Sequence, residues 1–376
     1  MAEYLTNTTD LTKVASAIRE KGGTSDSLVY PDGFVTAIQA IQTGTELQII
    51  VSVTSGATVT ATKGSKVVSG TSVNGTCTLT VPEAGTWSVK ATLGGQTSDT
   101  KSVTFTDNYS LTLSFVSSTL NDNEWDVIKS VSDAGQGANY WSIGDRKAVT
   151  LNGTVGHLSL SNYTTYAFII GFNHNASVEG ANRIHFQLAK TALSGGKDVC
   201  LCDSSHNWEV STTGYFSMNA SNTNSGGWKR SQMRTNICGT SLSSYSGTII
   251  AVIPAALRAV LKSVTKYTDN IAGGSAGISN ITATTDYFFL LSEYEVFGSI
   301  SRANTNEKNK QAQYAYYSAG NSKIKYKHNG TSTATRWWLR SPGASGSTGF
   351  LDVYTNGTVI HEAAKYSFGF APGFCV

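Results

Sequence analysis

Residues 335–376, TRWWLRSPGASGSTGFLDVYTNGTVIHEAAKYSFGFAPGFCV, decide how the C-terminal part of this chain is interpreted. A block rich in aromatic residues and glycine stands at each end, 336–343 (RWWLRSPG) and 368–374 (FGFAPGF). Between them, residues 349–360 mix small, aromatic and polar side chains in an alternating pattern. Two rigid blocks on either side of a stretch that tolerates different side chains predict a scaffold that displays a surface. They do not indicate a site of chemistry.

Residues 349–360 are predicted to form a strand followed by a hairpin turn at 355–358, because Asn356-Gly357 tolerates positive φ. Alternation along 350–354 directs Leu351 and Val353 to the core and the residues between them outward. Tyr, Ser, Asn and Gly are the adaptable residues of recognition surfaces. We expect a ligand-binding surface that consists of Ala344, Ser345, Ser347, Thr348, Phe350, Asp352, Tyr354, Asn356, His361 and Tyr366. An ordinary exposed hairpin without a ligand is the alternative.

The tryptophans favour a structural role. Trp337 and Trp338 would suit stacking on a sugar or a base, but in the frame Trp-Trp-Leu-Arg-Ser-Pro at least one of them belongs to the core. Arg340 is expected to satisfy buried carbonyl groups. The predicted scaffold residues are Trp141, Trp228, Trp337, Trp338 and Arg340.

Composition favours a mainly β protein. Of 376 residues, 14% are charged, below the usual quarter, while glycine (37) is abundant and proline (5) is scarce. This mixture is typical of short strands with many turns. The net charge of +3 is too small to indicate nucleic acid or an anionic membrane. No long apolar segment or signal-like N-terminus is found, so we expect no membrane insertion and synthesis in a cytoplasm.

The cysteines and histidines indicate neither a metal nor a cofactor. The five cysteines form no CxxC pair, and Cys200 and Cys202 would share one face of a strand. The six histidines show no HExxH or other metal-ligand spacing, and no GxSxG motif is present. We expect buried or free thiols, no cofactor and no catalytic residues.

Three domains are predicted. The first domain, residues 1–44, is expected to contain two helices. The first follows a cap at 7–10, has the helical spacing of Leu11, Val14, Ala15 and Ile18, and ends at 22–25. The second is lined by Phe34, Ile38 and Ile41. Forty residues cannot bury these stripes alone. Residues 18–41 (IREKGGTSDSLVYPDGFVTAIQAI) resemble a motif of structural proteins of tailed bacteriophages, which implies a docking or oligomerisation element. A generic helical hairpin is the alternative.

Residues 45–116 show strand periodicity at roughly ten-residue spacing, typical of a β-sandwich. The expected strands are 47–53, 57–61, 73–81, 87–91, 101–105 and 109–116. The segment resembles immunoglobulin-like or carboxypeptidase-regulatory-like sandwiches, and we expect it to act as a spacer.

Residues 117–376 predict a mixed α+β domain with long loops. Expected helices are 122–132 and 254–264, and expected strands are 166–172, 183–188 and 287–294.

Seven ordered blocks carry a family resemblance over 117–376. They are 125–153, 226–234 (GGWKRSQMR), 264–270 (VTKYTDN), 289–298 (FLLSEYEVFG), 313–326, 336–343 and 368–376. Their order resembles a phage and gut-bacterial family with the C-type-lectin fold, in the variant shared with formylglycine-generating enzymes and with proteins diversified by retroelements.

The resemblance implies a receptor-binding protein in the tail of a virion. Its partners would be a host cell-surface receptor and other tail proteins, and multivalency favours a homotrimer. Mutation of the adenines of an AAC codon never yields Trp, Glu, Lys, Gln or Met, so Glu362 and Lys365 are poorer candidates for diversified positions. The better candidates are Ala344, Ser345, Ser347, Phe350, Asp352, Tyr354, Asn356 and His361.

Other functions have weaker support. The chain lacks the Glu-Pro-Asn or Gln-Pro-Asp triplet of calcium-dependent lectins and the cysteine arrangement of formylglycine-generating enzymes. A structural decoration protein of the virion is the first alternative. A glycan-degrading enzyme is the second, since Glu293 and Glu295 would share one face of a strand. Contacts of these carboxylates with loop amides, Arg336 or Arg340 are the structural interpretation.

Overall fold

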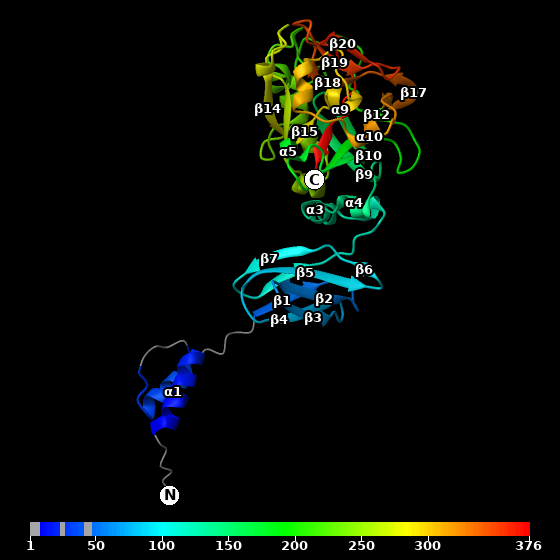
Figure 1. Cartoon of the computed structure of the whole chain (residues 1–376). Coiled ribbons are helices and arrows are strands. Elements are labelled where there is room, and N and C mark those ends of the chain that lie inside the picture. The colour runs from blue at the N-terminus through cyan, green and yellow to red at the C-terminus, as the bar shows by residue number, and fades with distance from the viewer. Residues whose placement is uncertain (1–7, 23–26, 41–46) are drawn as a thin grey trace. The chain divides into compact units, whose positions relative to one another are not determined.

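The computed structural model describes residues 8–22, 27–40 and 47–376 (Figure 1). The chain divides into two compact units, Met1–Ser114 and Phe115–Val376. Strands predominate over helices and form several sheets, which confirms the prediction of a mainly β, multidomain protein. Among the described residues, no helix is both long and apolar enough to cross a membrane.

The first unit begins with two helices, α1 (Thr8–Gly22) and α2 (Asp32–Ala40). Their apolar residues form a small core of Ala15, Ile18 and Phe34. Val14 and Ile38 were expected on the buried stripes but are about half exposed. Three further predictions, the cap at Asn7, the helix end at 23–25 and the core position of Ile41, lie outside the described residues.

Two sheets follow in the first unit. Their strands are β1 (Leu47–Ser52), β2 (Thr58–Lys63), β3 (Lys66–Thr71), β4 (Thr76–Val81), β5 (Gly85–Leu93), β6 (Gln96–Thr97), β7 (Lys101–Phe105) and β8 (Tyr109–Thr112). One sheet has the order β4-β1-β8, and the other has the order β3-β2-β5-β6, with β7 also paired to β5. An Asn-Gly turn lies between β3 and β4, with φ of 52° at Asn74 and 85° at Gly75, so the strand expected at 73–81 begins only at Thr76.

Strands β3 and β6 were not predicted. β3 is the outer strand of its sheet and most of its side chains are exposed, so its sequence carries no alternation of apolar and polar residues. β6 has only two residues.

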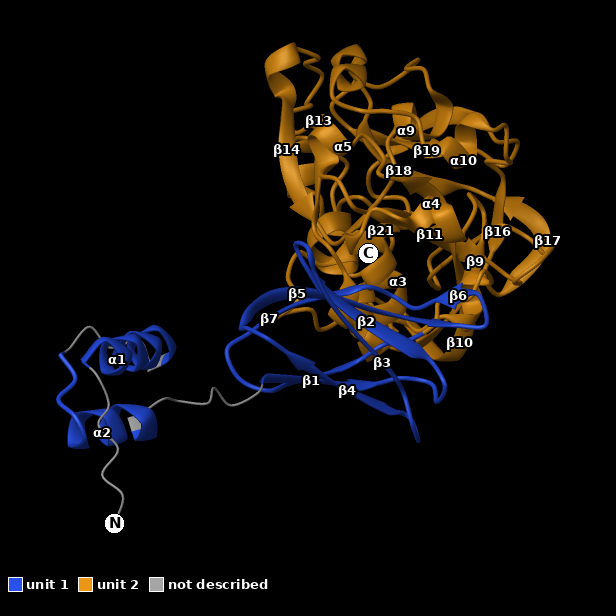
Figure 2. Ribbon diagram, turned by 60° about the horizontal axis from the view of Figure 1, so that its bottom comes forward, with its two compact units in different colours: residues 1–114 blue, residues 115–376 orange. Residues whose placement is uncertain are grey.

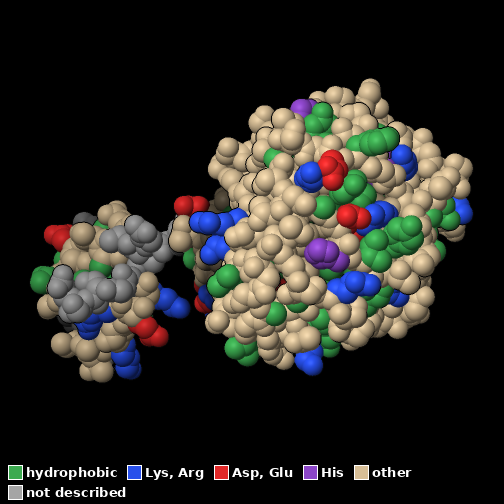
Figure 3. Space-filling model, turned by 90° about the horizontal axis from the view of Figure 1, so that it is seen from above, with side chains coloured by type: hydrophobic (Ala, Val, Ile, Leu, Met, Phe, Trp, Pro, Cys, Tyr) green, Lys and Arg blue, Asp and Glu red, His purple; other side chains and the backbone are tan. Residues whose placement is uncertain are grey.

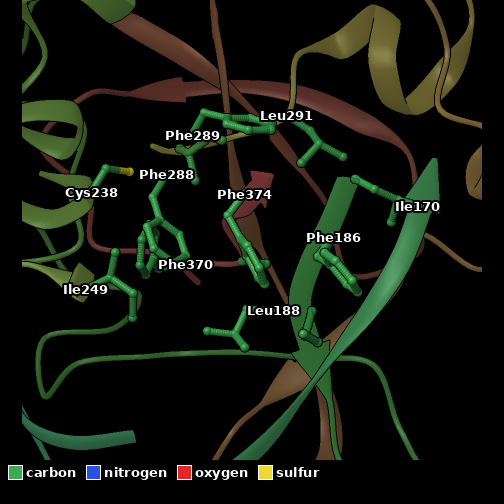
Figure 4. Packing of buried hydrophobic residues seen from close by; sticks show 14 of the residues in the cluster. Ile170, Phe186, Leu188, Cys238, Ile249, Phe288, Phe289, Leu291, Phe370 and Phe374 are labelled. Carbon is green, nitrogen blue, oxygen red and sulfur yellow. The ribbon is translucent and has the colours of Figure 1, made fainter. Parts of the chain in front are cut away.

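A five-stranded antiparallel sheet organises the second unit, which is orange in Figure 2. Its strand order is β15-β21-β11-β10-β9. The strands are β9 (Arg146–Val155), β10 (Leu158–Phe172), β11 (Ile184–Lys190), β15 (Phe288–Phe289) and β21 (Gly373–Cys375). The terminal aromatic block thus enters the middle of a sheet, where Phe374 packs with Phe186, Phe288 and other apolar side chains (Figure 4).

Smaller sheets and short helices complete the second unit. The sheets are β12 (Val199–Cys200) with β16 (Lys325–Lys327) and β17 (Gly330–Thr335), β13 (Val264–Asp269) with β14 (Ile281–Asp286), and β18 (Trp337–Pro342) with β19 (Gly349–Val353) and β20 (Val359–Ala363). The α-helices are α3 (Trp125–Asp133), α4 (Gly137–Tyr140), α5 (Ala176–Glu179), α6 (Gly227–Arg230), α7 (Ile249–Val252), α8 (Ala255–Val260), α9 (Glu293–Phe297) and α10 (Ala315–Ser318). Single turns of other helix types are η1 (Leu120–Asp122), η2 (Met233–Cys238), η3 (Ile278–Asn280) and η4 (Thr305–Asn309).

Three predicted elements of the second unit differ from the structure. The helix expected at 122–132 begins at Trp125, because 120–122 form a separate 3-10 turn. The helix expected at 254–264 ends at Val260, and Val264 starts β13. The strand expected at 287–294 is short, because a capping box between Ser292 and Glu295 starts helix α9.

All five cysteines are free and buried, as predicted. The sulfur atoms of Cys200 and Cys202 lie 3.9 Å apart, too far for a disulfide bond.

Candidate binding surface

The predicted binding surface is built on the sheet of β18, β19 and β20. Strand β19 is central and antiparallel to both neighbours. All five of its residues are buried, so the strand packs on both faces. The surface is therefore restricted to the loops at the two ends of the sheet and to β20, the outer strand that is only half-buried.

The predicted outward orientation of Phe350 and Asp352 is wrong, because both side chains are fully buried. Alternation does direct them to the face opposite Leu351 and Val353, but that face is covered as well. Of the three residues expected on it, only Tyr354 is exposed (40%).

Asp352 instead supports a charged network beneath the surface. Arg336 donates to both carboxylate oxygens of Asp352, from Nε at 2.8 Å and from Nη2 at 2.9 Å, and to Glu362 from Nη1 at 2.9 Å. Burial raises the pKa of Asp352 to about 6, against the opposing effect of Arg336. The guanidinium carbon lies 4.0 Å from the ring centre of Phe368 and 5.5 Å from that of Tyr354. Arg336 is thereby held rigidly by two acids and two rings.

A pocket of about 310 Å³ opens above this network. Its lining includes Asn207, Thr335, Arg336, Tyr354, Glu362 and Tyr366. Tyr354 and Tyr366 are predicted ligand-binding residues, and the pocket brings them together although they stand twelve positions apart. Aromatic faces beside a few polar groups are the usual lining of a ligand site.

Trp208, the neighbour in sequence of the lining residue Asn207, is an exposed aromatic residue that was not predicted. Its carbonyl oxygen accepts a hydrogen bond from the backbone N–H of Ser367 at 2.9 Å. Its side chain is 72% exposed, which is unusual for tryptophan. The signal in the sequence is its isolation in the polar run 203–209 (DSSHNWE), where no apolar periodicity requires a core residue.

The loop between β18 and β19, residues 343–348, contains four predicted ligand-binding residues. Ser345, Ser347 and Thr348 are exposed and Ala344 is half-buried. The buried side chain of Asn224 donates from Nδ2 to the carbonyl oxygens of Gly343, Gly346 and Gly349, at 3.3, 2.8 and 2.9 Å.

Further main-chain contacts hold the same loop. The backbone N–H groups of Asn224 and Ala364 donate to the carbonyl oxygens of Ser347 and Thr348, each at 2.9 Å. The N–H of Ala344 donates to the carbonyl oxygen of Arg302 at 2.9 Å. Main-chain atoms of the loop make these contacts, so the side chains at 345, 347 and 348 are not needed for its conformation.

The hairpin turn between β19 and β20 lies at the other end of the sheet. Gly357 has φ of 84°, and its N–H donates to the carbonyl oxygen of Tyr354 at 2.9 Å. Asn356 is exposed, and its Oδ1 accepts from the hydroxyl of Thr358 at 2.7 Å. Glycine takes the positive φ that the turn requires, and Asn356 faces solvent.

His361 and Tyr366 are half-buried. The His361 ring packs against Gly343 and Gly349, where any side chain at either glycine would collide with it. Its Nε2 has no hydrogen-bond partner. His361 therefore supports the loop at 343–348 from below, whereas Tyr366 belongs to the pocket.

The five predicted scaffold residues are all buried. Each tryptophan donates its indole N–H, Trp141 to the Ser117 carbonyl at 3.0 Å, Trp228 to Asp286 at 3.0 Å, and Trp337 and Trp338 to the Lys323 and Phe216 carbonyls at 2.9 Å. With these contacts made, none of the four is accessible for stacking on a ligand.

The acid pair Glu293 and Glu295 lies at the start of helix α9, which corrects the predicted strand positions. Glu293 accepts from the N–H groups of Ser301, Arg302 and Ala303 at 2.8 to 3.2 Å. Glu295 accepts from Arg340 and Lys266 and is fully buried. Both carboxylates are occupied by loop amides or cations, as the structural interpretation predicted.

One buried cluster has the residue types of a metal site. His174, Glu179 and Glu295 place three ligand atoms within 4.8 Å of one another, and this is the one such group in the part of the chain that the structure describes. Lys266 Nζ lies 2.6 Å from Glu179 and 2.9 Å from Glu295. Its ammonium group already supplies a cation between the two carboxylates, and we assign the cluster a structural role.

The exposed face over this sheet is mostly uncharged and polar. Figure 3 looks down on the β18–β20 end of the second unit, and its surface is largely tan, the colour of the backbone and of uncharged polar side chains. Hydrophobic and charged side chains form small separate groups on it.

Comparison with known proteins identifies one domain. Residues 205–376 match the family model described as a domain of unknown function (DUF6273). The match contains β18–β20, Asn224 and the residues that line the pocket. No curated protein and no solved structure matches the chain.

Proposed function

We propose that the chain is a receptor-binding protein of a phage tail, and that it binds its receptor with the loops and the pocket around β18–β20. The observation that carries this proposal is the support of the loop at 343–348 by main-chain atoms and Asn224. A loop held in this way keeps its shape while its side chains change. This is the property that a displayed recognition surface requires.

The resemblance of the seven sequence blocks supports the finer fold assignment. We propose a C-type-lectin-like fold for the second unit and an immunoglobulin-like spacer for the two sheets of the first unit. Phe350 and Asp352 are no longer proposed as contact or diversified residues, because they are buried. The proposed contact residues are Ser345, Ser347, Thr348, Tyr354, Asn356 and Tyr366, together with Trp208.

The charges of the pocket restrict its ligand. The single positive charge of Arg336 is matched by Asp352 and Glu362, so the pocket offers no free cation to an anionic group. The exposed Tyr354 and the half-buried Tyr366 supply flat apolar faces with polar edges. An uncharged polar segment of a cell-surface receptor, glycan or protein, fits this lining better than a phosphate-rich polymer.

The test is adsorption of the fluorescently labelled full chain to a panel of gut bacterial cells. With a strain that binds, Tyr354→Ala combined with Trp208→Ala should reduce the apparent affinity at least tenfold, since aromatic anchors dominate binding energy. Leu193→Ala, which removes an exposed side chain outside this surface, should bind like the wild type. Unchanged binding of the double variant would overturn the proposed site, and a decoration role would then be preferred.

The diversification part of the proposal has its own test. The nucleotide sequence downstream of the gene should contain a near-copy of its 3′ end that differs only at adenines, beside a reverse transcriptase gene. The differing codons should correspond to exposed positions such as Ser345, Ser347 and Tyr354. Without such a copy, the retroelement proposal fails and the binding proposal stands.

A further inference from the structure

Among the described residues of 8–40, the helix pair of the first unit exposes more apolar side chains than it buries. Three apolar side chains form its core, whereas Val14, Val29, Tyr30, Val35 and Ile38 are each about half exposed or more. A pair of short helices with so small a core is marginal in water. Exposed apolar side chains gathered on one small helix pair indicate an interaction site.

A groove and an apolar ridge lie on different parts of the same helix pair. The groove has a volume of about 300 Å³, and its apolar lining is Leu11, Ala15, Leu28, Tyr30 and Phe34. The ridge consists of Val35 and Ile38, which stand one turn apart on α2 and do not line the groove. Both halves of a helix-in-groove contact are therefore present in one chain.

The charges of the helix pair are balanced. Its described helices carry three acids and three bases, Asp10, Glu20 and Asp32 against Lys13, Arg19 and Lys21. A second copy would meet no net repulsion, and a strongly charged partner would gain no long-range attraction.

We propose that the helix pair is a self-association module, in which Val35 and Ile38 of one copy occupy the Leu11–Leu28–Phe34 groove of the next copy. Because ridge and groove are different surfaces, the contact is heterologous and repeats until the ring closes. Burial of the ridge adds apolar contacts that the isolated pair lacks, so self-association stabilises the helices. The inference does not depend on the proposed receptor binding.

The first test is the mass of the full chain by sedimentation velocity and light scattering. The wild type should form a closed oligomer, and Val35→Asp combined with Ile38→Asp should yield monomer, with at least a hundredfold weaker association. Thr36→Asp places the same charge on α2 at an exposed polar position and should leave the oligomer intact. A monomeric wild type at tens of micromolar (the concentration range of a weak specific complex) would overturn the proposal, as would an oligomeric double variant.

Cross-linking checks the geometry without adding charge. The five native cysteines are buried, so a bifunctional maleimide should react only with introduced thiols. The combination Leu28→Cys with Ile38→Cys should give covalent oligomers up to the size of the ring. Each single variant should stay largely uncross-linked. The proposed contact brings position 38 of one copy close to position 28 of the next copy, and it does not bring the same position of two copies together. Equal cross-linking of the Ile38→Cys variant alone would overturn the heterologous contact.

Discussion

At the scale of single residues, Asn224 has the largest effect on the proposed surface. It bonds three loop carbonyls, and its Oδ1 accepts from the Gly273 N–H at 2.9 Å. The two hydrogens of Nδ2, shared among the three carbonyls, and the acceptor Oδ1 amount to about three net hydrogen bonds, and each contributes about 1 kcal/mol. Asn224→Ala should therefore lower the free energy of unfolding of the second unit by about 3 kcal/mol in urea titrations and raise hydrogen exchange at 343–349. Ser345→Ala, at an exposed position, should stay within about 0.5 kcal/mol. Unchanged exchange in the loop would contradict the assigned role.

Glu295 is a second residue whose effect follows from its contacts. Burial opposes its charge, but Arg340 and Lys266 lower its pKa, so it is ionised in the folded protein. Glu295→Gln removes the carboxylate that Arg340 and Lys266 share, so these two buried cations lose part of the negative charge that balances them. Removal of one partner of a buried ion pair costs about 3–5 kcal/mol, which urea titration of tryptophan fluorescence should detect.

The control for this prediction is Glu362→Gln, because Glu362 is partly exposed and its ion pair with Arg336 is screened by water. It should cost less than about 1 kcal/mol. If the two variants are equally stable, the buried network is not the structural centre that its contacts indicate.

At the scale of elements, the β19–β20 hairpin separates positions that tolerate change from positions that do not. Phe350→Ser should destabilise the second unit by about 4 kcal/mol, because it removes a fully buried ring from β19. Asn356→Ser, in the exposed turn, should cost less than about 1 kcal/mol. Thermal unfolding of both variants checks this contrast. Similar melting temperatures would mean that β19 is less closely packed than the structure shows.

The same hairpin shows what local patterns predict and what they miss. The order strand, Asn-Gly turn and return strand follows from alternation and turn chemistry, and both are local properties. Asp352 is buried where it meets Arg336, which lies outside the hairpin. Alternation separates two faces of a strand, but it does not indicate whether the second face is covered.

Helix α9 and Asn224 mark two other limits of sequence analysis. The apolar run 287–291 favoured a longer strand, although Ser292 and Glu295 carried the capping pattern that stops it. Asn224 stands in a run of Ser, Asn and Gly that is typical of a loop. Its burial becomes visible only once the loop at 343–349, more than a hundred positions away, folds against it.

At the scale of the whole molecule, the titratable groups are unevenly distributed. All six histidines belong to the second unit. Burial lowers the pKa of His174 and His206 to about 3 and that of His328 to about 4. These imidazoles are neutral in the folded unit at pH 5, whereas an unfolded chain protonates them below about pH 6.5.

Their contribution to stability is therefore present above pH 6.5 and is lost as the pH falls. Glu179 acts in the opposite direction. Burial raises its pKa to about 7, so its contribution decreases as the pH rises through the range from about 4.5 to 7. The two effects partly cancel in the wild type, and a variant is needed to separate them.

His174→Phe isolates one histidine. The ring of His174 stacks on Tyr314 with 3.8 Å between ring centres, and phenylalanine keeps that contact without a titratable group. From pH 7.5 to pH 5, the free energy of unfolding of the variant should gain about 2 kcal/mol relative to the wild type, because 1.36 kcal/mol per pH unit accumulates over about 1.5 units below pH 6.5. Urea titrations at the two pH values measure this change, and Leu193→Ala should show the slope of the wild type. If the free energies of unfolding of His174→Phe and the wild type differ by the same amount at both pH values, His174 is protonated in the folded second unit at pH 5.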